Sequence, residues 1–198
     1  MVQSVLIVGL TGMPGAGKST LARSLSKAGL PVIVMGDVVR EAAINAKLEL
    51  TDNNLGYLMV ELRRQKGQGA IAYFVLDKIR SILGNSAPTR AIIIDGIRNI
   101  DEMKVLESLG PVKLLAVHGS TQVRFHHVKT RARADAPTTI DDFSERDNRE
   151  LGVGLSKAIA LADETISNNG ISIEQLCEQG LTIIEKWIVE KKGQTQLG

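Results

Sequence analysis

The chain has 198 residues, 43% of them hydrophobic, and a net charge of +2, which are ordinary proportions for one globular domain. The small net charge gives no reason to expect nucleic acid as a partner, and a single cysteine, Cys177, excludes an intramolecular disulfide and a cysteine-built zinc site. The apolar run Val5–Leu10 is far shorter than the ~20 residues of a membrane span and has no basic segment before it, so we expect a soluble, cytoplasmic protein.

Short apolar runs alternate along the chain with segments of helical periodicity. In chain order, the runs predict strands at 5–10, 32–35, 91–96, 112–118 and, with a weaker pattern, 163–168. The periodicity predicts helices near 21–28, 55–62 and 173–188, the last opened by a capping box of Ser172 and Gln175. Continuous β-branched runs are typical of parallel strands covered on both faces. We therefore expect an α/β fold with a doubly wound parallel sheet, as one domain over 1–198.

The segment GLTGMPGAGKST, residues 9–20, joins the first strand to the first helix and fits the phosphate-loop pattern G-x-x-x-x-G-K-[ST]. Such glycines let successive N–H groups form an anion cradle, to which the helix N-terminus adds positive charge. Lys18 would reach the β- and γ-phosphates, and Ser19 would offer its hydroxyl to Mg²⁺. The alternative is a glycine-rich turn that only caps a helix. We expect ATP and Mg²⁺ as cofactors, with ATP held by Gly12, Gly15, Ala16, Gly17, Lys18, Ser19 and Thr20.

Charged residues follow the second and third predicted strands. Asp37 and Arg40, in VMGDVVREAA, come just after the second strand, at the edge where ligands bind in such sheets. Asp95, at the end of the apolar run AIIID, is the candidate for holding the waters of Mg²⁺. The alternatives are that Asp37 caps an ordinary helix with Arg40 exposed, and that Asp95 and Gly96 form a simple turn.

The same segments resemble motifs of two kinase families. MGDVVRE resembles the G-D-x-x-R motif of adenylate kinases, whose arginine grips the acceptor phosphate, and the acidic segment of dephospho-CoA kinases, whose aspartate is thought to activate the acceptor hydroxyl. DGIRN resembles the D-G-F-P-R of adenylate kinases without its proline. The resemblance implies that Asp37, Arg40 and Arg98 bind the acceptor.

Two further segments have a binding and a structural interpretation. Arg131 and Arg133 stand where nucleoside monophosphate kinases carry lid arginines, with Arg146 and Arg149 beyond a short insert. The alternative is an exposed pair of helices rich in ion pairs, and His126 and His127 are expected on the surface.

ALADETISNNG resembles a segment of dephospho-CoA kinases that lies against adenine, which implies that Asn168 and Gly170 line the base site. A β-turn explains the same residues without a ligand.

Over most of its length the sequence resembles a group of adenylate-kinase-related, dephospho-CoA-kinase-like P-loop proteins known best from archaea. The shared segments include GMPGAGKS, MGDVVRE, ELRRQKGQGA, DGIRN and ERDNRELGVG. The resemblance implies a three-layer P-loop nucleotide-kinase fold with strand order 2-3-1-4-5, a helical acceptor-binding insert at about 37–85 and a lid at about 130–142. Glu102 stands where adenylate kinases carry a glutamine that reads the base of AMP, so AMP is not carried over as the acceptor, and neither is dephospho-CoA.

The motifs together predict a Mg²⁺-dependent phosphotransferase that uses ATP and a small nucleotide or nucleotide-like acceptor. Its catalytic residues would be Lys18, Asp37, Arg131 and Arg133. The main alternative is a P-loop ATPase or nucleotide-dependent switch, for which acceptor-side arginines are superfluous, and a third is a pure binding module. A GTPase is disfavoured because SNNG lacks the lysine and aspartate of an N-K-x-D motif.

Overall fold

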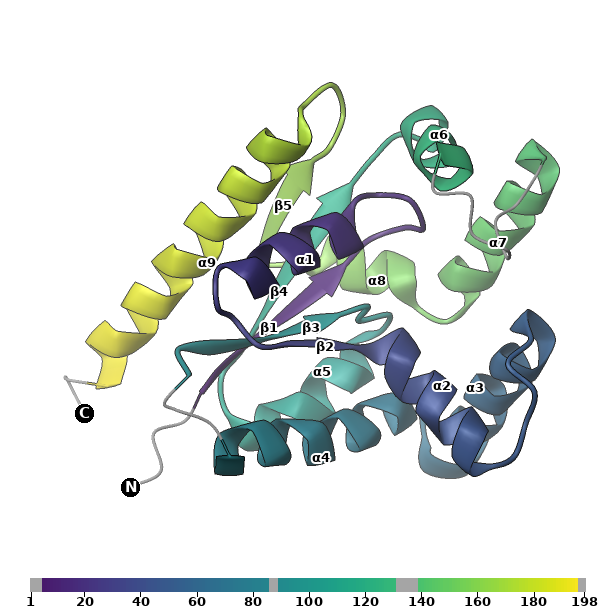
Figure 1. Ribbon diagram of the computed structural model, residues 1–198, viewed down its shortest axis with the longest axis horizontal. Coiled ribbons are helices and arrows are strands. Elements are labelled where there is room, and N and C mark those ends of the chain that lie inside the picture. Colours follow the sequence, from purple (N-terminus) through teal and green to yellow (C-terminus); the bar gives the residue numbers. More distant parts are fainter. Residues whose placement is uncertain (1–4, 86–88, 131–138, 196–198) are drawn as a thin grey trace.

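The computed structural model describes residues 5–85, 89–130 and 139–195 (Figure 1). Its strands are β1 (Leu6–Thr11), β2 (Val32–Val34), β3 (Ala91–Asp95), β4 (Val112–His118) and β5 (Glu164–Ser167). Its helices are α1 (Lys18–Lys27), α2 (Met35–Asn45), α3 (Asp52–Lys66), α4 (Ala70–Asn85), α5 (Ile100–Leu106), the 3₁₀ turn η1 (Glu107–Leu109), α6 (Thr121–Thr130), α7 (Ile140–Gly152), α8 (Leu155–Ala160) and α9 (Ile173–Thr195). All the predicted strands are confirmed, with the difference that Met35 begins α2 instead of ending the second strand.

The strands form one parallel sheet in the order β2-β3-β1-β4-β5, so the expected architecture is confirmed. β1 is central, and at its carboxyl end Leu10 is in register with Asp95 of β3 and Leu115 of β4. After β1 the chain forms β2 and β3, which lie on one side of β1 within the sheet, and later β4 and β5, which lie on the other side. Ligands of open α/β sheets bind in the crevice that such a reversal opens at the carboxyl ends of the strands.

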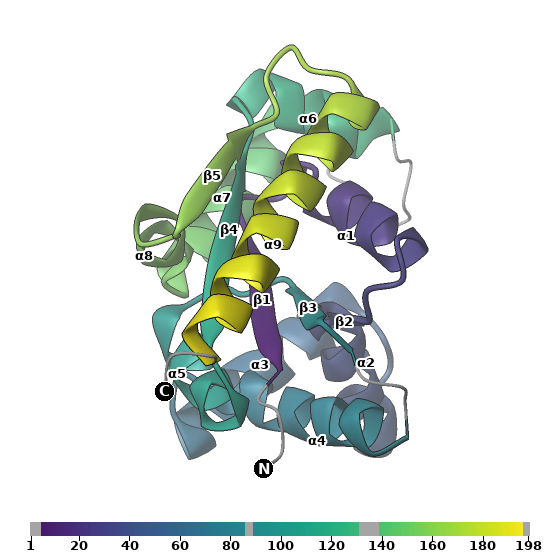
Figure 2. The same cartoon turned by 90° about the vertical axis from the view of Figure 1, so that its left-hand side faces the viewer.

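Both faces of the sheet are covered by helices, which explains why the strands are continuous apolar runs. Leu6, Val8 and Leu10 of β1 pack in one core with residues of α1 and α9, whereas Ile7 packs in a second core with residues of α2, α4 and α5 (Figures 1 and 2). Because successive side chains of a strand point to opposite faces, a strand covered twice has no solvent face. Full burial of each Leu or Ile contributes about 1.5–3 kcal/mol.

Between β2 and β3 the chain forms α2, α3 and α4, which coincide with the insert expected at 37–85. The N-cap of α3 is Thr51, whose hydroxyl accepts a hydrogen bond from the backbone N–H of Asn54 at 3.2 Å. These helices pack against one another and against the core that contains Ile7. Helix α2 follows directly on the carboxyl end of β2. The role of this segment in acceptor binding is a proposal.

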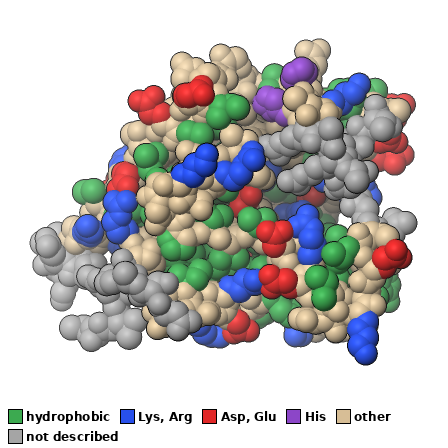
Figure 3. All heavy atoms as spheres, in the orientation of Figure 1, with side chains coloured by type: hydrophobic (Ala, Val, Ile, Leu, Met, Phe, Trp, Pro, Cys, Tyr) green, Lys and Arg blue, Asp and Glu red, His purple; other side chains and the backbone are tan. Residues whose placement is uncertain are grey.

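The predicted start of the last helix is confirmed. Ser172 Oγ accepts from the backbone N–H of Gln175 at 3.2 Å, and Gln175 Oε1 accepts from the N–H of Ser172 at 2.8 Å. Within the described ranges no helix combines the length and the apolar character that a membrane crossing needs. On the face drawn in Figure 3, basic and acidic side chains are interspersed over the described residues, as the small net charge suggests.

Candidate active site

The loop between β1 and α1 takes a backbone course that requires glycine. Gly12 has φ 139° and Gly15 has φ 80°, in the region that residues with a Cβ rarely adopt. A Cβ at Gly12 would lie 2.2 Å from the carbonyl oxygen of Val117, and one at Gly15 would lie 2.5 Å from that of Arg124. Both positions therefore need glycine for conformation and for space.

Lys18 lies at the start of α1 and folds back over the loop. Its Nζ donates to the carbonyl oxygens of Gly12 at 2.5 Å and of Met13 at 3.1 Å. The ammonium group is thus held close to the N-terminus of the helix, over the loop that precedes it. This arrangement puts a positive charge where the helix dipole also favours an anion.

The next three carbonyl groups of the loop accept hydrogen bonds from side chains that come from distant segments. The donors are Arg124 Nη1 to Pro14 at 3.1 Å, His127 Nδ1 to Gly15 at 3.0 Å and Asn168 Nδ2 to Ala16 at 2.9 Å. Since a carbonyl can only accept, His127 carries its proton on Nδ1 in this contact. Each of these three loop carbonyls is therefore held by a side chain from outside the loop.

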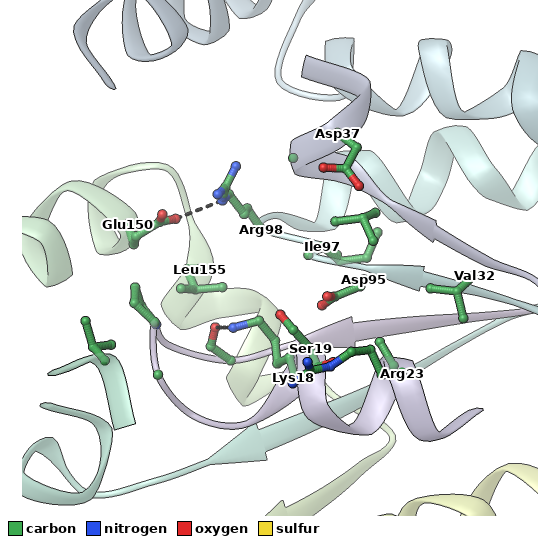
Figure 4. A pocket seen from close by; sticks show the side chains of 18 of the residues that line it. Lys18, Ser19, Arg23, Val32, Asp37, Asp95, Ile97, Arg98, Glu150 and Leu155 are labelled. Atoms are coloured by element: carbon green, nitrogen blue, oxygen red, sulfur yellow. Dashed lines mark hydrogen bonds and ion pairs between the residues drawn. The ribbon is translucent and has the colours of Figure 1, made fainter. Parts of the chain in front are cut away.

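A cavity of about 720 Å³ extends from this loop toward α2, the β3–α5 connection and α7 (Figure 4). Of the loop residues predicted to bind ATP, it is lined by Gly12, Gly15, Lys18 and Ser19. Ala16 and Gly17 are buried, and Thr20 is half-buried in the first turn of α1. The cavity also brings together the residues predicted for the metal and the acceptor, which are Asp37, Arg40, Asp95 and Arg98.

Asp95 and Ser19 supply oxygen atoms to the middle of this cavity. Asp95 is the last residue of β3 and is only 4% exposed, and Ser19 lies in the first turn of α1. Figure 4 shows both side chains directed into the same part of the cavity, next to Lys18. A carboxylate and a hydroxyl are hard oxygen donors, which suit Mg²⁺.

Asp37 and Arg40 lie on the rim of the cavity in α2. The N-cap of α2 is Val34, so Asp37 does not cap the helix; it lies in the first turn and forms an ion pair with Arg40. Both side chains are exposed, as in the alternative interpretation of Arg40.

Arg98 lies across the cavity in the β3–α5 connection. Its Nε pairs with Glu150 Oε2 of α7 at 2.9 Å (Figure 4). Its Nη1 lies 3.5 Å from the sulfur of Met59. The structure thus brings Arg40 and Arg98 to one cavity, each beside a carboxylate. Their joint grip on an acceptor phosphate stays a prediction.

The other predicted residues have different outcomes. Asn168 is 8% exposed and its amide braces the loop from outside, as the bond to Ala16 shows; Gly170 is exposed in the β5–α9 turn with φ 71°. Their contact with adenine stays a prediction. Arg131 and Arg133 lie outside the described residues, as does most of the expected lid, whereas Arg146 of α7 lines the cavity.

Two residues of α6 contribute to the site in ways that sequence reasoning missed. Arg124 is 4% exposed and forms a bidentate pair with Asp147, with Nη1–Oδ1 2.9 Å and Nη2–Oδ2 2.6 Å. The prediction that both histidines lie on the surface is wrong for His127, which is half-buried against Gly15, although His126 is exposed. Only the tertiary packing of α6 against the loop distinguishes these two neighbours.

Glu102, the residue that departs from the adenylate-kinase pattern, does not line this cavity. It is fully buried, where its Oε2 accepts from the backbone N–H of Arg98 at 2.8 Å and its Oε1 lies 3.2 Å from Arg63 Nη2. Burial raises the pKa of Glu102, against the opposing effects of Arg98 and Arg63. Its role in this structure is to fix the backbone of the connection that carries Arg98.

A family model described as an AAA domain matches residues 11–144. A UPF0200 protein of Thermococcus kodakarensis is 39% identical over 168 residues, which cover 83% of this chain and 89% of the relative. A UPF0200 protein of Hyperthermus butylicus is 41% identical over 170 residues, with 86% and 88% covered. The chain belongs to the family of this AAA domain and to the UPF0200 proteins. The expected likeness to archaeal P-loop proteins is confirmed at this level, and a specific relation to adenylate or dephospho-CoA kinases stays a prediction.

Solved structures share the fold at low sequence identity. The protein TT1252 of Thermus thermophilus matches with a TM-score of 0.66 and 18% identity over 92% of this chain and 98% of its own. A shikimate kinase from Bacteroides thetaiotaomicron matches at 0.56 and 16%, with 91% and 98% covered, and a gluconokinase from Sinorhizobium meliloti at 0.53 and 15%, with 96% and 97% covered. The fold is therefore that of P-loop kinases.

Proposed function

We propose that the protein is an ATP- and Mg²⁺-dependent phosphotransferase that acts on a small nucleotide or nucleotide-like acceptor. The observation that carries the proposal is the single cavity that joins Lys18 and Ser19 to Asp37, Arg40 and Arg98. Hydrolysis of ATP needs only the part of the cavity that holds Lys18 and Ser19. Transfer to a second molecule also needs the part that holds Asp37, Arg40 and Arg98.

The donor side fits ATP phosphates and Mg²⁺. A Cβ at Gly12 or Gly15 would meet backbone atoms, and the loop carbonyls are engaged by Lys18, Arg124, His127 and Asn168. Ser19 and Asp95 are the residues that would hold Mg²⁺ or its waters. Mg²⁺, when bound, neutralises the charge that develops on the phosphate oxygens.

On the acceptor side, Arg40 and Arg98 would bind the acceptor phosphate, because a guanidinium donates two parallel hydrogen bonds to phosphate oxygens. Transfer breaks the bond between the γ-phosphorus and its bridging oxygen and forms a bond to an acceptor oxygen. Where the acceptor is a hydroxyl, Asp37 would take its proton. Lys18, with Arg131 and Arg133 of the undescribed segment, would neutralise the transferring group.

The second candidate, a P-loop ATPase or nucleotide-dependent switch, is favoured by a specific observation. Arg40 is paired with Asp37, and Arg98 is paired with Glu150, so both arginines have structural partners without an acceptor. In that function water would be the acceptor, and these pairs would only hold α2 and α7.

One experiment separates the two candidates. ATP consumption is measured with Mg²⁺ alone and with AMP, dephospho-CoA or nucleosides, for wild type and for R40K/R98K. Lysine keeps the charge and loses the fork, so we expect an active acceptor whose KM rises about tenfold in the variant while the KM for ATP is nearly unchanged. R80K is the control, because Arg80 forms a similar exposed pair with Asp77 at 3.0 Å and does not line the cavity. Consumption that no acceptor changes, with R40K/R98K equal to R80K, would favour the ATPase.

A further inference from the structure

Arg124 connects three segments that are far apart in the sequence. Its Nη1 donates to the carbonyl of Pro14 in the phosphate loop at 3.1 Å, and its Nε donates to the carbonyl of Gly119 after β4 at 3.1 Å. The same guanidinium makes the bidentate pair with Asp147 of α7. With a side chain 5% exposed, facing a carboxylate 14% exposed, this planar fork has little freedom to adjust.

Helix α7 is also attached to the opposite side of the cavity. Glu150 lies one turn beyond Asp147 and pairs with Arg98 Nε at 2.9 Å. Arg146, next to Asp147 in the chain, lines the cavity together with Glu150. One helix thus carries a link to the phosphate loop, a link to the acceptor-side arginine and a cationic side chain in the cavity.

Apolar packing makes this arrangement stiff. Phe143 of α7 is fully buried, and its ring centroid lies 5.4 Å from that of Phe125 of α6. The guanidinium of Arg124 lies 4.9 Å from the ring centroid of Phe143. Close-packed side chains of a protein interior transmit a displacement because they have low compressibility. A shift of the Pro14 carbonyl would therefore be passed to Arg124, and from it to Asp147 and α7.

We propose that the Arg124–Asp147 pair couples occupancy of the phosphate loop to the position of α7, and through Glu150 to Arg98. Arg124 is in this view a positioning residue, which acts on the acceptor side without touching it. The inference rests on the proposed function in one respect, namely that the loop binds nucleotide phosphates. Coupling of this kind is reciprocal, so an acceptor on Arg98 would also change the affinity of the loop for its nucleotide.

Hydrogen exchange tests the coupling without knowledge of the acceptor. The full chain is labelled with and without Mg²⁺ and a non-hydrolysable ATP analogue, for wild type, R124K, D147N and R124K/D147N. In wild type we expect the analogue to slow exchange in residues 12–20, in α7 and at 96–99. In each variant we expect the analogue still to slow exchange in the loop, whereas the slowing of exchange that it causes in α7 should fall at least fivefold. The double variant should equal the single ones, because the pair acts as a unit.

R90K is the matched control. Arg90 pairs with Glu185 of α9 at 2.8 Å, which joins distant elements as Arg124 does, and neither residue lines the cavity. In R90K the analogue should slow exchange in the loop and in α7 as much as it does in wild type. D147N leaves Arg124 its bonds to Pro14 and Gly119 and provides a second test if R124K does not fold.

The outcomes are distinguishable. Protection of the loop together with an unchanged α7 response in R124K and D147N would overturn the coupling and leave the proposed function standing. Loss of α7 protection in the variants to the same extent with and without the analogue would assign the pair a merely structural role and also overturn it. A wild-type chain whose loop gains no protection would contradict the proposed function, and the coupling with it.

Discussion

Lys18 shows how a single side chain is held in place by the backbone around it. Its Nζ is bonded to the carbonyl oxygens of Gly12 and Met13, so the ammonium is already positioned over the loop instead of extended into solvent. Exchange of these carbonyl contacts for phosphate oxygens replaces neutral acceptors by anionic ones, which attract the ammonium group by their full charge.

We expect K18A to lower turnover of Mg²⁺·ATP by about 10²-fold or more, because a charge aimed at the β- and γ-phosphates is lost. The measurement is the steady-state rate of ADP release, together with the melting temperature with and without Mg²⁺·ATP, which a bound ligand raises. K27A is the control, since Lys27 lies at the other end of α1 and is exposed. Equal turnover and equal thermal shifts in K18A and wild type would disprove the phosphate-loop assignment.

At the scale of elements, the phosphate loop depends on donors from α6 and from the β5–α9 turn. Asn168 is one such donor: its Nδ2 donates to the Ala16 carbonyl at 2.9 Å, and its backbone N–H donates to the carbonyl of His118 at 2.7 Å. A Cβ at Gly17 would come within 2.6 Å of the same Nδ2. The turn, the loop and the end of β4 are therefore packed as one unit, although the chain joins them only through long connections.

N168A should lower the free energy of unfolding by about 1–3 kcal/mol, since it leaves the buried carbonyl of Ala16 without its donor. It should also weaken binding of an ATP analogue, because the loop loses one of its outer supports. N169A is the matched control: the Oδ1 of exposed Asn169 accepts from Ser120 at 2.8 Å, where water can replace it. Urea unfolding and a binding titration check both effects, and equal losses in the two variants would contradict the assignment.

At the scale of the whole molecule, the Arg63–Glu102 pair joins α3 of the helical insert to α5, which follows β3. Arg63 of α3 is 7% exposed and Glu102 of α5 is fully buried, and the Nε of Arg63 is buried without a hydrogen-bond partner among the described residues. Taking two charges out of water is costly, so such a pair adds little net stability. Removal of one partner is severe, because the other charge is left buried.

E102A should therefore lower the free energy of unfolding by roughly 3–5 kcal/mol, because the buried Arg63 guanidinium and the backbone N–H of Arg98 both lose their acceptor. R63M/E102A should lose less than the sum of the two single variants. E61Q/R64M serves as the control cycle, because Arg64 and Glu61 form a surface pair in the same helix, where the coupling is small. Urea unfolding measures both cycles. Additive losses at positions 63 and 102 would contradict the buried-pair assignment.

The same residue makes stability depend on pH. Burial raises the pKa of Glu102, so the folded state binds its proton more readily than the unfolded chain does. The associated stability is present in full below the ordinary pKa of a glutamate and is lost as the pH rises through the folded pKa. Unfolding free energies measured from about pH 4 upward should contain this decline in wild type and lack it in E102Q. Parallel pH profiles would show that Glu102 does not titrate in this window.

The sequence by itself determined the sheet and the position of the phosphate loop. Continuous apolar runs predicted parallel strands, because a strand covered on both faces leaves no polar side, and the glycines of 12–17 with Lys18 marked the loop. The position of Asp95 could be predicted for a related reason: neighbouring parallel strands end at one edge of the sheet, so the residues at those ends lie close together. Arg98 was predicted from the resemblance of DGIRN to a motif of adenylate kinases. These signals are local, since each lies within about a dozen residues.

Only the tertiary structure decided which charged side chains serve the site and which serve the scaffold. His126 and His127 are neighbours of the same type, yet one is exposed and the other holds Gly15. Arg124 is separated by 110 residues from Pro14, whose carbonyl it binds, and by 23 residues from Asp147. Hydrogen bonds and ion pairs act over a few ångströms in space, whatever the separation along the chain, so a pattern within one segment cannot reveal a partner that packing brings from another.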